Sequence, residues 1–588
     1  MFKYKRGINN IEMAKKVEFC MSDNLNTYLV MNATLENKKP YHALYIRNNK
    51  VILENLVEKI EFNNRVYKCM NFSNNLQNIS CDEYMVSIDL DNYSFEYDLG
   101  LLKYTKKFIY SHQKSTFIIE YEVTNNSNSN AKFELIPFVT YRDLYISDKT
   151  VCFNFNQRKV DDGQLINLSV KDNENLVLKS DFCEFVQEVK HLKNVKREFI
   201  DDDYTKNVFL EDLFIPGSFL IDISPNTVQR FNIIVTDKNF NINDFNYEEE
   251  IKKYNEMKDS IFSNIKEEFT ELKDLAITIN NLDLEEKMYS SLPNIIKELD
   301  IDNIINVTKS IEGAYLILNK EEKAKLILNN VKKYIDSIKE DNQNNEEKII
   351  LLKLWFIESV NRLYQRSKTD LDILFDFVKE EVEDLINNKN NFKNYLNNIE
   401  VVSLWYNALK IYENMLSKND ISNEHIYFLA EEIKEKIVSD FWDDKKRLMK
   451  CHLDEEETKA NISMIYVLSL SYQANLGDIP IKLLDSIFKE LYTPYGLRKT
   501  SKLDSNYNGL LYPEYMAYFV KANLRQNGVT RASQKIAYNL VKELLLDINK
   551  YVNGGVKKTY HEKGLNIDNV TYDLLTNSEI IRLYDMLT

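Results

Sequence analysis

The chain has 588 residues, a net charge of −15 and 44% hydrophobic residues. This composition excludes a globally disordered chain. The acidic balance argues against a surface for nucleic acid or anionic membranes, because such surfaces need clustered Lys and Arg. The six cysteines have no CxxC spacing and no run of 18 apolar residues occurs, so we expect a cytoplasmic protein with reduced thiols.

The first 240 residues have the pattern of β-strands. The stretch 108–146 alternates aromatic or branched residues with polar ones, and the Asn/Ser run 125–130 interrupts it as a turn. The segment 230–237 is a further predicted strand. Many short strands with polar turns predict an antiparallel β-sandwich.

The pattern changes from strands to helices near residue 245. The charged segment 246–272 has helical apolar spacing, which predicts a linker helix. About twelve helical stretches follow it. Their predicted starts lie near residues 284, 309, 321, 346, 369, 400, 423, 459, 482, 513, 530 and 576.

These helices predict six hairpins closed into an (α/α)6 toroid, with an open helical array as the alternative. The fold class is therefore a multidomain β + α protein. We expect a β-sandwich domain at 1–244, a linker helix at 245–274 and the toroid at 275–588.

Cofactor-binding signatures are missing from the sequence. Glycine is scarce, with 12 residues, and neither GxGxxG nor GxxxxGK[ST] occurs, so phosphate-binding loops have little material. Six histidines are scattered along the chain, and His452 beside Cys451 has no third ligand at zinc-like spacing. We expect no cofactor and no metal.

Four stretches, in this order along the chain, carry a family resemblance. They are NKKPYHALYIR (37–47), ELIPFVTYRDLYIS (134–147), IEVVSLWYNALKIYE (399–413) and LYTPYGLR (491–498). Together they resemble glycogen debranching enzymes of the amylo-α-1,6-glucosidase family. The resemblance implies a β-sandwich followed by a toroid whose central cleft binds α-glucan.

The resemblance also implies hydrolysis of a glucosidic branch bond. This reaction needs one carboxylic acid to protonate the leaving oxygen and one carboxylate to activate water. The family's acidic D-W-G-R-D motif aligns with 302–306, where Asn306 replaces the second Asp, and the family's catalytic glutamate aligns with Lys557 or Lys558. Both acids are thus replaced, which predicts impaired or absent hydrolysis.

Several side chains remain as candidates for a site. The weak catalytic candidates are Asp302, Glu514 and Glu562. The candidate glucan contacts are Glu400, Trp405, Asn407, Tyr495, Arg498, Tyr507 and Tyr512. Helix core for Trp405, a helix cap for Glu400 and turn stabilisation for Arg498 are the structural alternatives.

The segment from Tyr495 to Tyr512 is expected to line the mouth of the toroid. Its polar run 499–508 could be buried only with unpaired polar groups, which cost about 1–3 kcal/mol each. Tyrosine offers a flat apolar face with a hydroxyl at its edge, which suits a glucose ring.

Three functions stay open from the sequence. The first is a catalytically impaired family member that binds α-glucan or serves as a noncatalytic partner of another protein. The second is an active α-glucosidase that uses other acid and base residues. The third is a structural assembly component without sugar binding.

Overall fold

The structure is a computed structural model. It describes residues 2–22, 27–47, 50–69, 72–73, 78–79, 81–111, 115–143, 155–160, 163–169, 174–200, 206–237, 246, 248–250, 252–253, 256, 301–338, 346–367, 371–387, 392–548, 550, 554–563 and 573–587. The helix expected near 284 lies outside these residues. So does most of the linker helix expected at 245–274, of which 248–250, 252, 253 and 256 are described and are helical.

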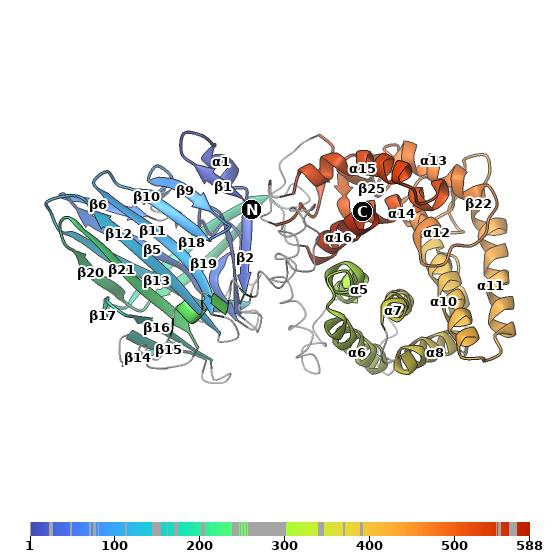
Figure 1. Ribbon diagram of the computed structural model, residues 1–588, viewed down its shortest axis with the longest axis horizontal. Coiled ribbons are helices and arrows are strands. Elements are labelled where there is room, and N and C mark those ends of the chain that lie inside the picture. The colour runs from blue at the N-terminus through green and yellow to red at the C-terminus, as the bar shows by residue number, and fades with distance from the viewer. Residues whose placement is uncertain are drawn as a thin grey trace. The chain divides into compact units, whose positions relative to one another are not determined.

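The chain divides into two compact units. The β unit comprises Met1–Met288, Ile548–Gly555 and Ile567–Thr571, and the helical unit comprises Tyr289–Asp547, Val556–Asn566 and Tyr572–Thr588. In Figure 1 the strands of the β unit are blue to green, and the helices of the helical unit are yellow-green to red.

The β unit contains two large antiparallel sheets. One has nine strands in the order β1-β9-β10-β11-β12-β21-β16-β15-β14, and the other has ten strands built on the path β17-β20-β13-β5-β4-β3-β2. The first sheet consists of β1 (Lys3–Lys5), β9 (Met85–Asp89), β10 (Ser94–Asp98), β11 (Leu102–Ser111), β12 (Thr116–Asn125), β14 (Asn156–Val160), β15 (Gly163–Ser169), β16 (Glu174–Ser180) and β21 (Thr227–Thr236). The second consists of β2 (Glu18–Ser22), β3 (Thr27–Asn32), β4 (Ala43–Arg47), β5 (Lys50–Phe62), β6 (Arg65–Cys69), β13 (Ala131–Asp143), β17 (Glu184–Val186), β18 (Lys190–Ile200), β19 (Lys206–Ile215) and β20 (Ser218–Ile223).

One apolar core joins the inner faces of the two sheets. Tyr104 of β11 meets Phe133 of β13 edge-to-face with ring centroids 5.7 Å apart, and Phe19 of β2 lies 5.9 Å from Phe95 of β10. Both pairs join one sheet to the other, so the predicted antiparallel sandwich is confirmed. The strands β12 and β13 also confirm the alternating stretch and its interrupting turn.

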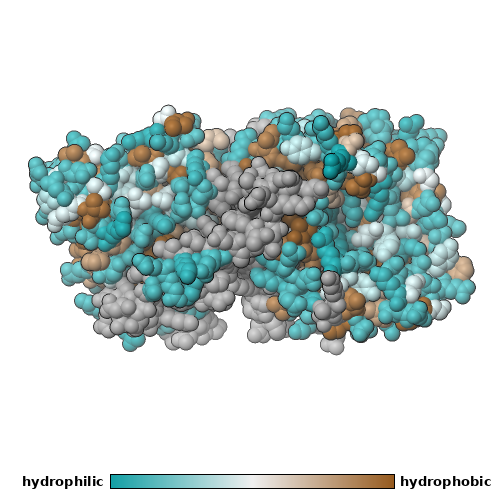
Figure 2. Space-filling model, viewed as in Figure 1, coloured by the Kyte–Doolittle hydropathy of each residue, from teal (hydrophilic) through white to brown (hydrophobic). Residues whose placement is uncertain are grey.

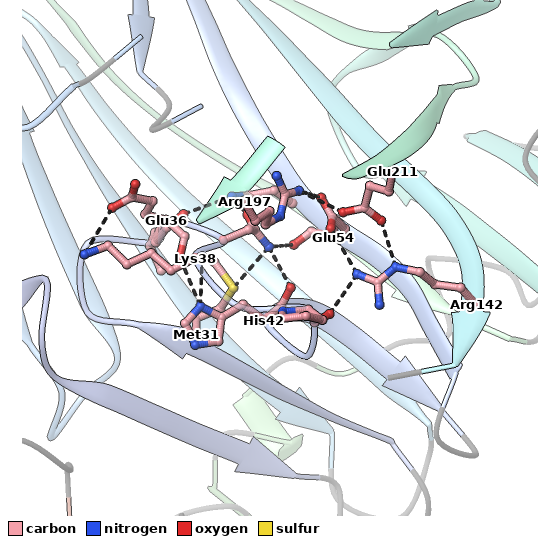
Figure 3. A network of polar contacts seen from close by, with 12 residues as sticks. Met31, Glu36, Lys38, His42, Glu54, Arg142, Arg197 and Glu211 are labelled. Atoms are coloured by element: carbon pink, nitrogen blue, oxygen red, sulfur yellow. Dashed lines mark hydrogen bonds and ion pairs between the residues drawn. The ribbon is translucent and has the colours of Figure 1, made fainter. Parts of the chain in front are cut away.

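A buried ion network lies within the β unit (Figure 3). Arg142 donates from Nε to Glu211 at 2.7 Å and from Nη2 to Glu54 at 3.3 Å. Arg197 pairs with the same two carboxylates. Asn37 donates to the backbone carbonyls of His42 and Glu54. The two family-like stretches of the sandwich, 37–47 and 134–147, therefore meet in this network.

The helices of the helical unit form a closed ring. They are α5 (Ile301–Ile311), α6 (Glu321–Ile338), α7 (Glu346–Arg366), α8 (Leu371–Asn387), α10 (Ile399–Lys418), α11 (Glu424–Lys436), α12 (Tyr466–Ser469), α13 (Ile479–Leu491), α14 (Met516–Asn527), α15 (Arg531–Leu546) and α16 (Leu574–Leu587). The inner helices α5, α7, α10, α12, α14 and α16 contact one another in that order, and α16 packs back on α5. This closure confirms the toroid over an open array.

Inner and outer helices differ in their burial, as the apolar patterns require. The outer helix α6 buries one stripe, with Ala324, Leu328 and Val331 among its members, which matches helical periodicity. The inner helix α7 is buried without interruption over 352–364 because other helices surround it. The helices predicted at 321 and 346 begin at those residues.

Three predicted helix starts are displaced. The helix expected near 482 begins at Ile479. The helix expected near 309 begins at Ile301. The helix expected near 459 begins with a 3-10 turn at Ile462, because the side chain of Asn461 accepts a hydrogen bond from Ser463 N at 3.0 Å and caps that turn.

A small four-stranded sheet accompanies the ring. Its strands are β24 (Tyr492–Thr493), β25 (Gly496–Arg498), β26 (Leu510–Tyr512) and β27 (Tyr560–His561). Gly496 has φ +157 and a Cβ there would lie 2.7 Å from the Tyr512 backbone, so the close approach of β25 to β26 requires glycine.

The visible surface is mostly hydrophilic, with hydrophobic residues scattered over both units (Figure 2). Exposed apolar side chains such as Phe182 and Leu503 are of the ordinary kind found on globular proteins. No helix in the described part of the chain is both long and apolar enough to cross a membrane.

Candidate active site

Acidic, basic and aromatic side chains gather where the inner helices begin. Glu400 is the second residue of α10, and Tyr466 is the first residue of α12. Glu514 lies in the 3-10 turn η8 (Pro513–Tyr515) that leads into α14, and Asp573 directly precedes α16. The closed ring thus brings together residues that are far apart in the sequence.

Glu514 is the acid with the most unusual environment in this group. Within the described residues its carboxyl has no hydrogen bond and no ion pair. Burial raises its pKa to about 7, and the like charge of Asp573 acts in the same direction, against Lys309, Lys499 and Lys558. A carboxyl with a pKa near 7 is partly protonated at neutral pH, as a general acid must be.

Glu400 is held by two side chains of neighbouring inner helices. Trp355 of α7 donates from Nε1 to Glu400 Oε1 at 3.3 Å. Lys309 of α5 has its ammonium 3.9 Å from the same oxygen and 4.3 Å from the Trp355 ring centroid. Asn398 caps α10 by accepting from Glu400 N at 2.9 Å. These contacts fix the carboxylate at the start of the helix.

Asp573 is a further carboxylate of the site. It accepts from Thr576 N at 2.8 Å and from Thr576 Oγ1 at 2.6 Å, which caps α16. Lys558 pairs with it at 3.3 Å. Lys558 is one of the two lysines aligned with the family's catalytic glutamate, so this position carries a cation next to a second acid.

Aromatic rings form a wall beside these carboxyl groups. Trp355 meets Tyr466 edge-to-face with centroids 5.2 Å apart, and Tyr466 meets Tyr518 in the same way at 5.3 Å. Tyr515 lies 6.4 Å from Tyr466. Burial raises the pKa of the Tyr466 and Tyr515 hydroxyls far above their usual range, so both stay neutral. Trp355, Tyr466 and Tyr518 are 1–3% exposed, so they support the carboxyl groups from the core. Tyr515 is partly buried and is the ring of this wall that a sugar could reach.

Sequence analysis missed Lys309, Asp573 and most of this aromatic wall. The pattern Asp573-x-x-Thr576 before an apolar run is a helix-capping signature that could have revealed the start of α16. No local signal identifies Lys309, because its neighbours Trp355, Glu400 and Tyr466 come from three other helices.

Two of the three catalytic candidates lie in environments that do not suit an acid catalyst. Asp302 has a half-exposed side chain and pairs with the exposed Lys348 at 2.7 Å. Glu562 accepts from Arg498 at 2.8 Å and also contacts Lys502 and Tyr507. The bond from Arg498 is the largest influence that lowers the pKa of Glu562 to about 2, so it cannot hold a proton at neutral pH.

Other candidate glucan contacts are engaged inside the protein. Trp405 is buried and meets Phe392 at 5.0 Å, as a core residue does. Asn407 is fully buried, and its amide donates to Glu358 at 2.9 Å and accepts from Tyr472 N at 2.8 Å. These contacts support packing roles for Trp405 and Asn407, and their glucan contacts remain predictions.

The candidate glucan contacts of the small sheet differ in how strongly other residues of the protein engage them. Arg498 donates to the carbonyls of Glu490 and Tyr492 as well as to Glu562, so its guanidinium stabilises the turn. Tyr495 stacks on Tyr560 with centroids 5.2 Å apart. Tyr512 is partly buried and has the Lys499 ammonium 4.4 Å from its ring centroid.

Family models match both parts of the chain. The model described as glycogen debranching enzyme N terminal matches residues 18–229, which cover most of the sandwich. The model described as amylo-alpha-1,6-glucosidase matches residues 397–518, which contain Glu400, Tyr466 and Glu514. Together the two matches cover more than half of the chain. The chain belongs to the amylo-α-1,6-glucosidase family of glycogen debranching enzymes.

Two solved structures are similar to this chain over most of its length. A bacterial glucoamylase complexed with acarbose is 10% identical, with 97% of this chain and 93% of that chain covered and a TM-score of 0.58. A kojibiose phosphorylase candidate from the human microbiome is 8% identical, with 97% and 82% covered and a TM-score of 0.45. At this identity the glucoamylase supports the fold alone. No curated protein sequence matches the chain.

Proposed function

We propose that this family member hydrolyses a glucosidic bond of α-glucan at the start of the inner helices, with Glu514 as the proton donor. The observation that carries this proposal is the carboxyl of Glu514, which has a pKa of about 7 and no partner in the described residues. Glycoside hydrolysis requires such an acid next to a carboxylate that acts on water or on the sugar. Glu400 and Asp573 are the two carboxylates available for that second role.

The chemistry would use the charges already described. Glu514 would give its proton to the leaving glucosidic oxygen as the bond breaks. The second carboxylate would activate water, and the partly buried Tyr515 would contact the sugar, while the buried Trp355 and Tyr466 would support the site from the core. Lys309 would keep Glu400 oriented through its 3.9 Å contact.

Binding of glucan without hydrolysis is the second candidate function. It is favoured by the engagement of Asp573, whose carboxylate already accepts two bonds from Thr576 and pairs with Lys558. Asn306, and either Lys557 or Lys558, also stand where the family motifs have acids. In this case the site would retain a sugar but would transfer no proton to it.

One experiment separates the two functions. Glucose release from branched limit dextrin is measured alongside glucan affinity electrophoresis, for the unmodified protein, Glu514→Gln and the exposed-site control Glu424→Gln. Release that is lost only in Glu514→Gln supports hydrolysis. Retardation by glucan without any release supports binding alone. The absence of both would overturn both functions and leave a structural role.

A further inference from the structure

A cavity of about 460 Å³ lies in the helical unit at the far ends of the inner helices. Its lining residues come from η4 (Glu312–Leu316), α14, α15 and α16 and from the turn after α14. They are Glu312, Lys521, Leu524, Arg525, Val529, Gln534, Arg582, Asp585 and Met586. Glu514 and Asp573 precede α14 and α16, and the cavity is lined by later residues of the same two helices.

The cavity's cations are only partly neutralised. Lys521 and Arg525 of α14 each lack a carboxylate within 4 Å in the described part of the chain. Arg525 instead donates to the carbonyls of Leu468, Leu470 and Ser471, which satisfies its N–H groups but leaves its charge. Lys521 has no hydrogen-bond partner among the described residues. Two like charges four residues apart on one helix face destabilise the helix unless something between them compensates.

The cavity's acids, by contrast, already have partners on α7. Arg362 lies 3.2 Å from Glu312, and Arg366 contacts both Glu312 at 3.6 Å and Asp585 at 3.4 Å. Burial opposes the charge on Glu312, but the neighbouring arginines and Lys521 hold its pKa at about 2. These carboxylates make their close ion pairs with arginines, whereas Glu312 and the buried Glu358 attract Lys521 only at longer range.

Arg582 adds unused hydrogen-bond donors to the same cavity. Its side chain is 3% exposed, and its guanidinium lies 4.1 Å from the Tyr518 ring centroid. It forms ion pairs with Glu579 at 3.0 Å and with Glu312 at 3.8 Å, yet none of its three nitrogens has a well-oriented hydrogen bond within the described residues. Arginine has no acceptor, so such buried donors call for oxygen atoms of a ligand or of water.

We propose that this cavity is a second binding site, which takes a phosphate-bearing small molecule such as a sugar phosphate. Phosphate oxygens accept from ammonium and guanidinium groups in short charge-assisted bonds. The volume lies in the range of small-molecule sites and exceeds what a bare phosphate fills. Burial is the largest influence that lowers the pKa of Lys521 to about 8; Arg362 and Arg582 act in the same direction, and the carboxylates of Glu358 and Glu312 oppose it.

The test is isothermal titration calorimetry of the full chain with glucose 6-phosphate, inorganic phosphate and glucose. We expect glucose 6-phosphate to bind more tightly than glucose. Lys521→Gln with Arg525→Gln should weaken that binding about tenfold or more, because the charge-assisted bond from Lys521 and the positive charge of Arg525 are both lost. The exposed control Lys535→Gln on α15 should bind unchanged, and Asp585→Asn should bind more tightly because one acidic group has gone.

These titrations test the phosphate site independently of the proposed hydrolysis. If inorganic phosphate binds as tightly as glucose 6-phosphate, the site is supported and takes the free anion. If glucose 6-phosphate binds no more tightly than glucose, the proposal is overturned. It is also overturned if neither the double variant nor Asp585→Asn changes the affinity for glucose 6-phosphate. Glu514→Gln should keep full affinity for glucose 6-phosphate whether or not the chain hydrolyses glucan.

Discussion

The sandwich and the ring both enclose carboxylates, but they pair them differently. In the sandwich, Glu54 and Glu211 are shared between two buried arginines, Arg142 and Arg197. In the ring, Glu514 has no partner among the described residues, and burial raises its pKa to about 7. Paired charges fix a structure, because breaking the pair leaves a buried charge. An unpaired buried carboxyl remains able to hold and release a proton.

The largest expected effect tests which carboxylate works with Glu514. Asp573→Asn and Glu400→Gln are compared in glucose release from limit dextrin. Replacing the carboxylate that activates water should lower the hydrolysis rate about 10²–10⁴-fold, as the loss of a general base does. Replacing the other carboxylate should lower the rate less, because that residue only orients its neighbours. Equal, small losses in both variants would contradict a two-carboxylate mechanism in this ring.

The second effect tests the paired network of the sandwich. Arg142→Met should lower the free energy of unfolding of the β unit by about 3–5 kcal/mol, because Glu54 and Glu211 lose a buried partner. The matched control is Arg230→Gln, which removes the exposed pair with Glu122 and should cost about 0–1 kcal/mol. Urea unfolding followed by circular dichroism measures both.

The tryptophans provide an internal reference for that measurement. All three, at positions 355, 405 and 442, lie in the helical unit. Their fluorescence should therefore report little change in the ring of the Arg142→Met protein. A loss of the fluorescence transition equal to the loss of the β signal would contradict a network that serves the sandwich.

The third effect concerns the pH dependence of hydrolysis. Glu514 donates a proton, so only its protonated form is active, and that fraction falls as pH rises through its pKa of about 7. The turnover rate should be nearly constant just below this pH and should fall about tenfold per pH unit above it. The residual rate of Glu514→Gln should lack this limb. A limb that persists in this variant would assign it to another group.

The elements that could be predicted from the sequence are those with a local signal. The alternation in β12 and β13 and the helical stripe of α6 are visible in a few consecutive residues. Glu400 and Glu514 were found because motif-like neighbours surround them. Sequence analysis therefore gave the layers, the ring and two carboxyl groups of the site.

The other residues of the site come from helices that are distant in the sequence and meet only in the folded structure. Lys309 and Asp573 join the site when α5 and α16 meet at the closure of the ring. Asp302 was a candidate by position, but α5 begins at Ile301 rather than near 309, and in its first turn Asp302 faces Lys348. The sequence does not show that Glu562 is unsuited to be an acid catalyst. Its ion-pair partners, Arg498 and Lys502, come from a strand and a loop of the small sheet and are identified only in the structure.

The smallest expected effect distinguishes the two tyrosines that were predicted to share glucan binding. Tyr512→Ala removes a partly buried ring whose known neighbours are Lys499 at 4.4 Å and the edge of Tyr515 at 6.5 Å. Tyr495→Ala removes a ring that is already stacked on Tyr560. We therefore expect glucan retardation in affinity electrophoresis to weaken in Tyr512→Ala and to stay nearly unchanged in Tyr495→Ala.

The stability of the two variants should follow the opposite order. Tyr495→Ala loses an aromatic pair worth about 0.5–1.5 kcal/mol, so its melting temperature should fall. Tyr512→Ala loses a cation–π contact with Lys499, which stabilises by about 0.5–1 kcal/mol. Its melting temperature should therefore fall less than that of Tyr495→Ala. Weakened retardation in Tyr495→Ala with an unchanged melting temperature would reverse this assignment, since an already stacked ring would then be the one that holds the glucan.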